Sequence, residues 1–256
     1  MNTKKVTLSK AQAAGSIDAP SPQTRSLETK LELLLAAEKL FALNGLLGVS
    51  IRQIVSEANQ RNVSTVHYHF GSRDALIYAI CKHRMFDIEQ DRANRLAQYL
   101  QFPGSPHDRV VALLSVFIWP SAQPIITRHG HSYFRRFLAH SFVSDTVDLP
   151  GFIKGRFDTG MRQIAGLLRQ DLKHLSEASF HIRWALMIRS VTYLLANLEA
   201  RAEATSKAKA TAIIQSGVQN IAVSFAGMLQ APENPSNDEH SNSRQKAATK
   251  KKRSSK

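Results

Sequence analysis

The chain has 256 residues, 43% of them hydrophobic, which is long enough to bury one large core or two smaller ones. Its 34 basic and 20 acidic side chains give a net charge of +14, which favours polyanionic partners. The single cysteine, Cys81, excludes an intramolecular disulfide and a metal site built from several cysteines. No run of 18 apolar residues and no apolar leader occur, so we expect no transmembrane helix, no membrane partner and a cytoplasmic location.

Both ends of the chain are expected to be disordered arms. Residues 1–23 and 231–256 are polar and lack hydrophobic periodicity, so they cannot bury enough apolar surface to offset the entropy of ordering. The Lys-rich C-terminal tail is either a solvated tail or a non-specific tether to DNA. Between the arms, apolar residues repeat at helical spacing without a convincing strand or internal repeat, and the sequence therefore predicts an all-α fold.

The first predicted helix begins near Thr24 and ends at Asn44-Gly45, a common helix stop. Apolar residues three, four and seven positions apart predict one buried stripe along it. The expected members of that stripe are Leu27, Leu31, Leu34 and Phe41.

A short second helix is predicted after Val49. Ser50 and Gln53 form a capping box, and Val49 is expected to pack against Ile54 as a hydrophobic staple. The inward face of this helix should hold Ile51, Ile54, Val55 and Ala58.

The third helix is expected between Asn62 or Ser64, either of which can cap it, and Gly71. Ser72 then caps a fourth helix, whose inward residues should be Leu76, Ala79, Ile80, Phe86 and the buried Cys81. Short helices joined by tight turns predict a compact helix-turn-helix unit over residues 24–84.

Residues 85–230 are expected to form a second helical unit. One helix should stop at Pro120, where "SAQP" interrupts the pattern. The last two helices should occupy about 177–203 and 206–230. Small residues along the final helix, such as Ser216 and Gly217, permit close approach by another helix.

The third helix carries the residues that most suggest DNA binding. Val66 and Phe70 can face the first helix, which leaves hydroxyl and imidazole groups outside, where they can hydrogen-bond to base edges in a major groove. Arg73 and residues 24–26 lie at helix starts, where a phosphate is stabilised by free N–H groups. The candidate DNA-binding residues are Thr24, Arg25, Ser50, Arg52, Arg61, Asn62, Ser64, Thr65, His67, Tyr68, His69 and Arg73.

Metal binding or catalysis is the competing interpretation of the histidines. His67 and His69 are two apart and do not share a helix face, so they chelate poorly, and His69 beside Phe70 fits plain packing. His129 and His131 could chelate from a loop, but no carboxylate is near them in sequence. No P-loop, dinucleotide or nucleophile-elbow motif occurs, so we expect no enzyme activity, metal or cofactor.

Together these segments resemble the tetracycline-repressor (TetR) family of bacterial regulators over about residues 24–79. The resemblance rests on "LFALNG", on "VSIRQIVSEAN" and on "VHYHFGSRDAL", where the family usually has Tyr-X-His-Phe followed by Gly/Asn-Ser/Lys-basic-acidic-Ala-Leu. The turn "ANQRN" is one residue longer than the usual Ala-Gly-Val-Ser/Asn, and a subset of the family with Gln-Arg-Asn looks similar. Asn59 stands where Gly is usual, and asparagine tolerates the left-handed conformation.

The resemblance implies an all-helical homodimer that pairs through its last two helices and binds a near-palindromic double-stranded operator. It implies phosphate contacts by Thr65, Tyr68 and Arg73, with Ser64, Thr65 and His67 nearest the bases. It also implies a small-molecule effector, bound in the second unit, that releases the DNA.

Large side chains of the second unit are candidates to line the effector pocket, although most such residues at helical spacing are simply core. Four arginines lie among these apolar runs: Arg135, Arg136, Arg183 and Arg189. An arginine that faces a cavity could pair with an acidic ligand, although a solvated face is the ordinary position for such residues. The candidate pocket residues are Phe117, Trp119, Tyr133, Phe137, His140, Trp184 and Met187.

The sequence therefore predicts a ligand-responsive, sequence-specific transcriptional repressor in the nucleoid. Two alternatives remain open at this point. One is a non-catalytic helical dimer that acts through protein partners, since residues 24–84 hold only eight basic against five acidic side chains. The other is a helical enzyme that uses the His129–His131 loop.

Overall fold

The computed structural model describes residues 21–100 and 104–233, and over these residues the fold is all-α with no strand. This confirms the predicted fold class. The expected N- and C-terminal arms lie almost wholly outside the described residues. The helices are α1 (Pro22–Asn44), α2 (Ile51–Glu57), α3 (Ser64–Phe70), α4 (Arg73–Tyr99), α5 (Pro106–Thr127), α6 (Phe134–Phe142), α7 (Leu149–Ile153), α8 (Thr159–Asp171), α9 (Glu177–Glu203) and α10 (Lys207–Gln230).

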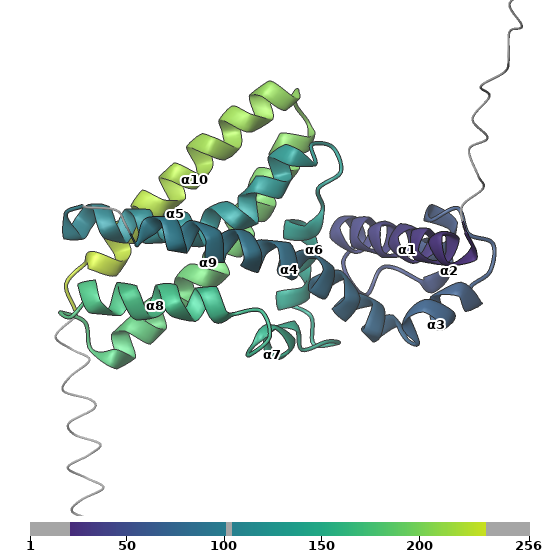
Figure 1. The fold of residues 1–256 in the computed structure, drawn as a ribbon, viewed down its shortest axis with the longest axis horizontal. Coiled ribbons are helices and arrows are strands. Elements are labelled where there is room, and N and C mark those ends of the chain that lie inside the picture. The colour runs from purple at the N-terminus through teal and green to yellow at the C-terminus, as the bar shows by residue number, and fades with distance from the viewer. Residues whose placement is uncertain (1–20, 101–103, 234–256) are drawn as a thin grey trace, which may run out of the picture.

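The molecule is elongated, with α1, α2 and α3 at one end and α5, α8, α9 and α10 at the other (Figure 1). Helix α4 runs from the first end into the second. Two hydrophobic clusters match this division, but the N-terminal cluster also includes Phe134, Phe137 and Leu149 from α6 and α7. The core of the N-terminal end is therefore completed by residues 50 or more positions beyond it in the sequence.

The helix-start signals are used as the sequence predicts, with one shift. Ser50 and Gln53 form the capping box, and the Ser72 hydroxyl accepts from Ala75 N at 3.1 Å. The first helix starts earlier than expected, because the Ser21 hydroxyl caps it by accepting from Thr24 N at 3.2 Å. Thr24 is thus inside the first turn, and the predicted start at Thr24 is wrong by two residues.

The predicted stripe of α1 is only partly correct. Leu34 and Phe41 are buried, but Leu27 is 69% exposed and Leu31 is also exposed. The first buried residue of the helix is Leu33, so Leu27 lies before the packed region. Leu31 is two residues from Leu33, which turns it about 200° away around the helix.

Phe86 is 60% exposed, although the sequence analysis placed it inside α4. The buried face follows three- and four-residue steps through Ile77, Cys81, Met85 and Ile88, and Phe86 falls between these positions. Cys81 is fully buried as expected, and burial raises the pKa of its thiol to about 12.

The predicted break at Pro120 is wrong, because α5 continues through Pro120 and Pro124 to Thr127. A proline inside a helix removes one backbone hydrogen bond and crowds the preceding turn. Here Pro120, Ser121, Ala122 and Ile125 are buried. Tertiary packing of this face offsets the local cost, which a sequence pattern does not reveal.

Two helices in the described part of the chain, α5 and α10, are long and apolar enough to cross a membrane by length and composition alone. The sequence analysis expected no helix of this kind. In the most apolar 18-residue window, 50% of α5 and 33% of α10 are buried inside the chain. Both pack in the C-terminal hydrophobic cluster, and core helices commonly reach this level of hydropathy.

Helices α9 and α10 approach closely at Gly217. A Cβ atom at this position would lie 2.6 Å from Leu198 Cδ1, so a larger residue would force the Leu198 side chain to move. The small residue Gly217 thus allows α10 to pack closely on α9 within one chain.

Candidate nucleic-acid interface and effector cavity

The connection between α2 and α3 has the conformation that the sequence predicts. Asn59 has φ of 53°, the only positive φ outside glycine in the described ranges. Backbone bonds from Asn59 N to Ser56 O and from Gln60 N to Val55 O close the turn after α2. Asparagine at this position therefore replaces the usual glycine without breaking the helix-turn-helix.

Side chains hold this turn against α1. Gln60 Nε2 donates to Glu32 Oε2 at 3.1 Å, and Lys39 Nζ pairs with Glu57 Oε1 at 2.5 Å. These contacts join the C-terminal end of α2 and the turn after it to the first helix. The orientation of α3 therefore depends on α1 as well as on its own turn.

Helix α3 is anchored by one face and open on the other. Val66 is buried and Phe70 is half-buried, as expected. The N-cap residue is Val63, whose side chain makes no capping bond, so the prediction that Asn62 or Ser64 caps this helix is wrong. Asn62 lies one residue further out, and its Oδ1 accepts from Ser64 N at 2.9 Å. The exposed face holds Ser64, His67 and Tyr68, with Thr65 half-buried beside them.

His67 makes a hydrogen bond that defines its ring chemistry. Its Nδ1 lies 2.6 Å from the carbonyl oxygen of Gly71. A carbonyl oxygen only accepts, so Nδ1 carries the hydrogen and the Nε2 of a neutral ring is an acceptor. An exposed acceptor of this kind can receive a hydrogen bond from an amino group on a base edge.

His69 packs between aromatic neighbours. Its ring lies 4.9 Å from that of Tyr68 in an edge-on arrangement and 6.3 Å from that of Phe70. Burial, with a smaller effect of Lys30, lowers the pKa of His69. Lys30 Nζ also lies 5.6 Å from the centre of the Phe70 ring, so this side of α3 is packed on α1.

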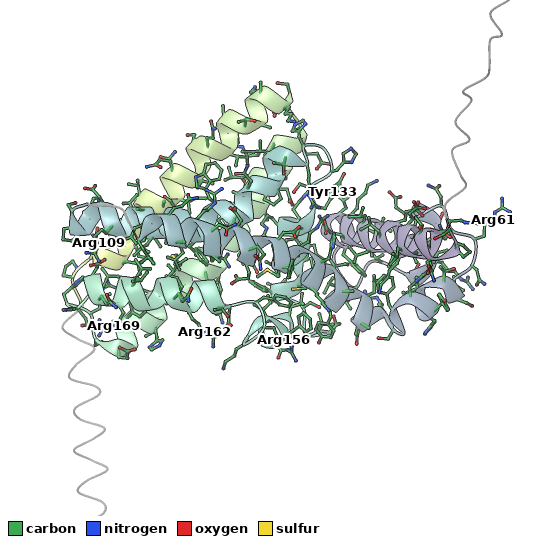
Figure 2. The ribbon with its side chains drawn as sticks, in the orientation of Figure 1. Arg61, Arg109, Tyr133, Arg156, Arg162 and Arg169 are labelled. Atoms are coloured by element: carbon green, nitrogen blue, oxygen red, sulfur yellow. The ribbon has the colours of Figure 1, made fainter. Side chains whose placement is uncertain are left out.

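The basic candidates occupy different environments. Arg52 and Arg61 are exposed, and Figure 2 shows Arg61 projecting from the end of the molecule formed by α1, α2 and α3. Arg73 is half-buried instead, with Nη2 donating to Leu46 O and the guanidinium 5.1 Å from the centre of the Phe41 ring. In this structure Arg73 therefore ties α4 to the end of α1, a role that the sequence analysis missed.

Thr24, Arg25 and Ser50 lie at exposed helix starts. The hydroxyl of Thr24 is 2.9 Å from that of Ser21, and the hydroxyl of Ser50 donates to Gln53 Oε1 at 2.8 Å. Both hydroxyl groups are thus already engaged in hydrogen bonds at the helix starts.

The candidate pocket residues do not share one cavity. Phe117, Trp184 and Met187 are core residues of the C-terminal cluster, and Phe137 is fully buried in the N-terminal one. His140 is exposed. Trp119 and Tyr133 line two separate, open hollows, with Tyr133 where α6 meets α1 (Figure 2).

A different cavity, of about 240 Å³, lies between α1, α4, α5 and α6. None of the seven candidates lines it. Its walls include Glu38, Arg84, Asp87, Ile88, Asp91, Pro120, Ser121, Gln123, Pro124, Thr127, Arg128, Ser132, Phe134 and Arg135.

Buried charges beside this cavity are the functional feature that sequence reasoning missed most clearly. Arg84 makes a two-pronged ion pair with Glu38, with Nε–Oε2 at 2.6 Å and Nη2–Oε1 at 2.9 Å. Both side chains are buried, and burial raises the pKa of Glu38 while Arg84 opposes that rise. These residues are 46 positions apart, so no local pattern signals the pair.

Glu199 of α9 is a second buried carboxylate. Its oxygens accept from the backbone N–H groups of Arg135 and Arg136 at 3.2 and 3.0 Å, and from the Ser132 hydroxyl at 2.8 Å. No side chain from the preceding residue caps α6. Glu199 therefore supplies the missing cap and the negative charge that a helix N-terminus favours.

The histidine loop has no catalytic arrangement. His129 Nε2 donates to the carbonyl of Ala202 at 3.1 Å, while His131 is exposed. Within residues 21–100 and 104–233, no three His, Cys, Asp or Glu side chains are grouped to hold a metal ion. The loop thus packs on α9.

A three-helix unit with an exposed polar third helix, joined through α4 to a larger helical unit, defines a helix-turn-helix DNA-binding protein. The family model described as "Bacterial regulatory proteins, tetR family" matches residues 33–80. That described as "Tetracyclin repressor-like, C-terminal domain" matches residues 115–228. The chain belongs to the TetR family of bacterial transcriptional regulators.

Among curated relatives, the HTH-type transcriptional regulator BetI of Brucella canis is 31% identical over 85 residues, which is 33% of this chain and 40% of BetI. BetI of Brucella abortus matches to the same extent. The chain thus spans less than half the length of these relatives.

Solved structures of the family are also similar to this chain. A TetR-family regulator from Shewanella sp. PV-4 has a TM-score of 0.48 and 19% identity, covering 75% of this chain and 96% of its own. A mutant of HlyIIR has a TM-score of 0.48 and 20% identity, covering 77% and 97%.

Proposed function

We propose that this protein represses transcription by binding an inverted-repeat DNA operator as a homodimer, and that a small-molecule effector releases it. The observation that carries the proposal is the exposed polar face of α3, which is held from behind by buried Val66. Helices of this kind enter the major groove in helix-turn-helix proteins. The family relationship supports the same function.

Within this proposal, residues 24–84 bind DNA and residues 85–230 bind the effector and the second subunit. Ser64, Thr65 and His67 contact bases, and the Nε2 acceptor of His67 suits the amino group of adenine or cytosine. Tyr68, 80% exposed, and Arg61 suit phosphates. The remaining phosphate and backbone candidates are Thr24, Arg25, Ser50, Arg52, Asn62, His69 and Arg73.

The dimer is proposed to form through α9 and α10. Exposed apolar side chains lie along one side of α9, including Ile182, Leu186 and Tyr193, and Val223 is exposed on α10. A second copy of this chain would bury these side chains in a four-helix interface. In a monomer, these side chains would leave an unusually large apolar surface exposed to solvent.

Because it acts on chromosomal DNA, the protein is proposed to work in the cytoplasm, at the nucleoid. The net charge of +14 supports attraction to a polyanion of this kind.

Selection of randomised duplex DNA by the purified protein tests the proposed function. An enriched inverted repeat is expected, because a two-fold symmetric dimer presents two copies of α3 to two half-sites. Recovery of DNA without a motif, with binding that disappears at moderate salt, would show that the chain holds DNA by charge alone and would overturn the proposal.

Replacement of Arg61 by alanine should weaken binding to operator and random DNA alike and lower the salt slope by about 1, since one phosphate contact is lost. His67→Ala should instead cost about 1–3 kcal/mol on the operator and relax specificity at one base pair. Fluorescence anisotropy at two salt concentrations, on both DNAs, separates the two effects. Equal losses from both variants on both DNAs would contradict this division of roles.

A further inference from the structure

The cavity between α1, α4, α5 and α6 contains arginine side chains whose hydrogen-bonding capacity is not used. Arg84 and Arg135 both line it and are both buried. In the part of the chain that the structure describes, Arg84 Nη1 and Arg135 Nη2 are buried without a hydrogen-bond partner. A buried guanidinium nitrogen without an acceptor costs free energy, so each of these atoms favours an acceptor nearby.

One of the arginines around these atoms makes no ion pair. Glu38 is paired with Arg84, and Glu199 is paired with Arg136 at 3.3 Å and with the backbone of α6. Arg135 makes no ion pair within 4 Å in the described residues; its guanidinium instead lies 4.5 Å from the centre of the Phe134 ring. Burial lowers the pKa of Arg135 to about 10, so it remains charged at neutral pH. Arg136 also pairs with Glu203, at 2.7 Å, so three acids and three arginines lie in this group. Arg135 is the arginine of the group whose charge has no ion-pair partner.

The carboxylates at the rim of the cavity do not neutralise the charge of Arg135 at its inner end. Asp87 lies 3.8 Å from Arg128, and Asp91 pairs with Arg95 at 2.9 Å. Asp87 is exposed and Asp91 is half-exposed, so solvent screens their effect on a buried cation. Deeper in, Arg92 adds to the positive potential at Arg135, but its own charge is matched by Glu89.

Part of the wall is apolar and the space is small. Ile88, Pro120, Pro124 and Phe134 line the cavity together with the arginines. Its volume of about 240 Å³ is below the roughly 300–1,000 Å³ of a site for a drug-sized ligand. Such a cavity suits a compact molecule with one anionic end and one apolar end.

We propose that this cavity binds a small organic monocarboxylate, whose carboxylate lies between Arg84 and Arg135 and whose apolar part lies against the two prolines and Phe134. The carboxylate accepts from the two unpartnered guanidinium nitrogens and gives Arg135 the ion-pair partner that it lacks. The proposal adds a ligand class to the proposed function. Only the identification of the cavity as an effector site rests on that function.

The position of the cavity links the ligand to the DNA-binding end. Arg84 belongs to α4 and pairs with Glu38 of α1, whereas Arg135 belongs to α6, which Glu199 attaches to α9. A bound carboxylate therefore links α1 and α4, which lie next to α3, through α6 to α9 of the proposed dimer interface. A ligand that prefers one arrangement of these helices shifts the population toward it.

Calorimetric titration of the full-length protein with benzoate, hexanoate and neutral benzamide tests the site without DNA. Benzoate or hexanoate is expected to bind, and benzamide is expected to bind at least ~10-fold more weakly because it has no charge to pair. Arg135→Gln should weaken carboxylate binding by a similar factor. Arg162→Gln is the matched control, since Arg162 is an exposed arginine on α8, away from the cavity (Figure 2).

The proposal is overturned if neither carboxylate binds, if benzamide binds as well as benzoate, or if Arg135→Gln and Arg162→Gln behave alike. Inorganic phosphate as the only anion bound would also overturn it. If Arg135→Gln does not fold, the comparison of benzoate with benzamide on the unaltered protein decides the question alone. DNA selection is scored separately, so carboxylate binding without an operator would overturn the regulator and leave the anion site standing.

Discussion

Replacement of both Ile182 and Leu186 by glutamate is expected to convert the protein into a monomer. These side chains are 64% and 54% exposed on α9, and in the proposed dimer two copies of them are buried together. Four buried carboxylates in an apolar interface have no partner, and each costs several kcal/mol. Sedimentation equilibrium at several protein concentrations measures the change.

The same variant should bind the selected inverted repeat about 10²–10⁴-fold more weakly, because the α3 helix of a second subunit is no longer held next to the second half-site. Binding to an isolated half-site should be unchanged. Val143→Glu is the control, since Val143 is equally apolar and 70% exposed, but lies at the end of α6. A double variant that remains dimeric would show that α9 does not form the interface.

Replacement of Arg84 by methionine is expected to reduce the free energy of unfolding by about 3–5 kcal/mol. The change leaves the Glu38 carboxylate buried without its two-pronged partner. Burial already raises the pKa of Glu38, and loss of Arg84 raises it further. For an acid raised in this way, the destabilisation grows as pH increases above the ordinary value of 4.5, so the defect should shrink as pH falls toward that value.

Urea denaturation at pH 5 and pH 8 measures this effect. Lys39→Met is the matched control, because Lys39 is the next residue after Glu38 and also makes an ion pair, with Glu57, but at the surface. Its loss should cost less than about 1 kcal/mol. The double variant Glu38→Leu/Arg84→Met should recover most of the stability, because it buries no unpaired charge. Equal losses from Arg84→Met and Lys39→Met would contradict the role assigned to burial.

The local features of the DNA-binding end were predictable because their causes are local. The capping box at Ser50, the turn at Asn59 and the helix stop at Gly71 each depend on residues within four positions. Backbone preferences and short-range hydrogen bonds determine them, and a sequence displays both. The inward position of Val66 follows from the same periodicity.

The features that failed depend on distant residues. A helix continues through Pro120 because of what packs on it, and Leu27 is exposed because it lies before the part of α1 that packs on the other described helices. The Glu38–Arg84 pair and the cap of α6 by Glu199 join residues 46 and 64 positions apart. The cavity is formed by four helices, so none of its walls could be assigned from one segment.

The cap of α6 by Glu199 also bears on how the chain folds while it is being made. Helix α6 packs on α1, yet the carboxylate at its first turn is attached only after 64 further residues have been added to Arg135. At translation rates of 5–20 residues per second, that interval is roughly 3–13 s. During this time α1–α3 have left the ribosome, while the start of α6 has unsatisfied N–H groups. The core of the DNA-binding end includes Phe134 and Phe137 of α6, so this end reaches its final packing only after α6 has been made, and the cap of α6 follows when α9 has been added.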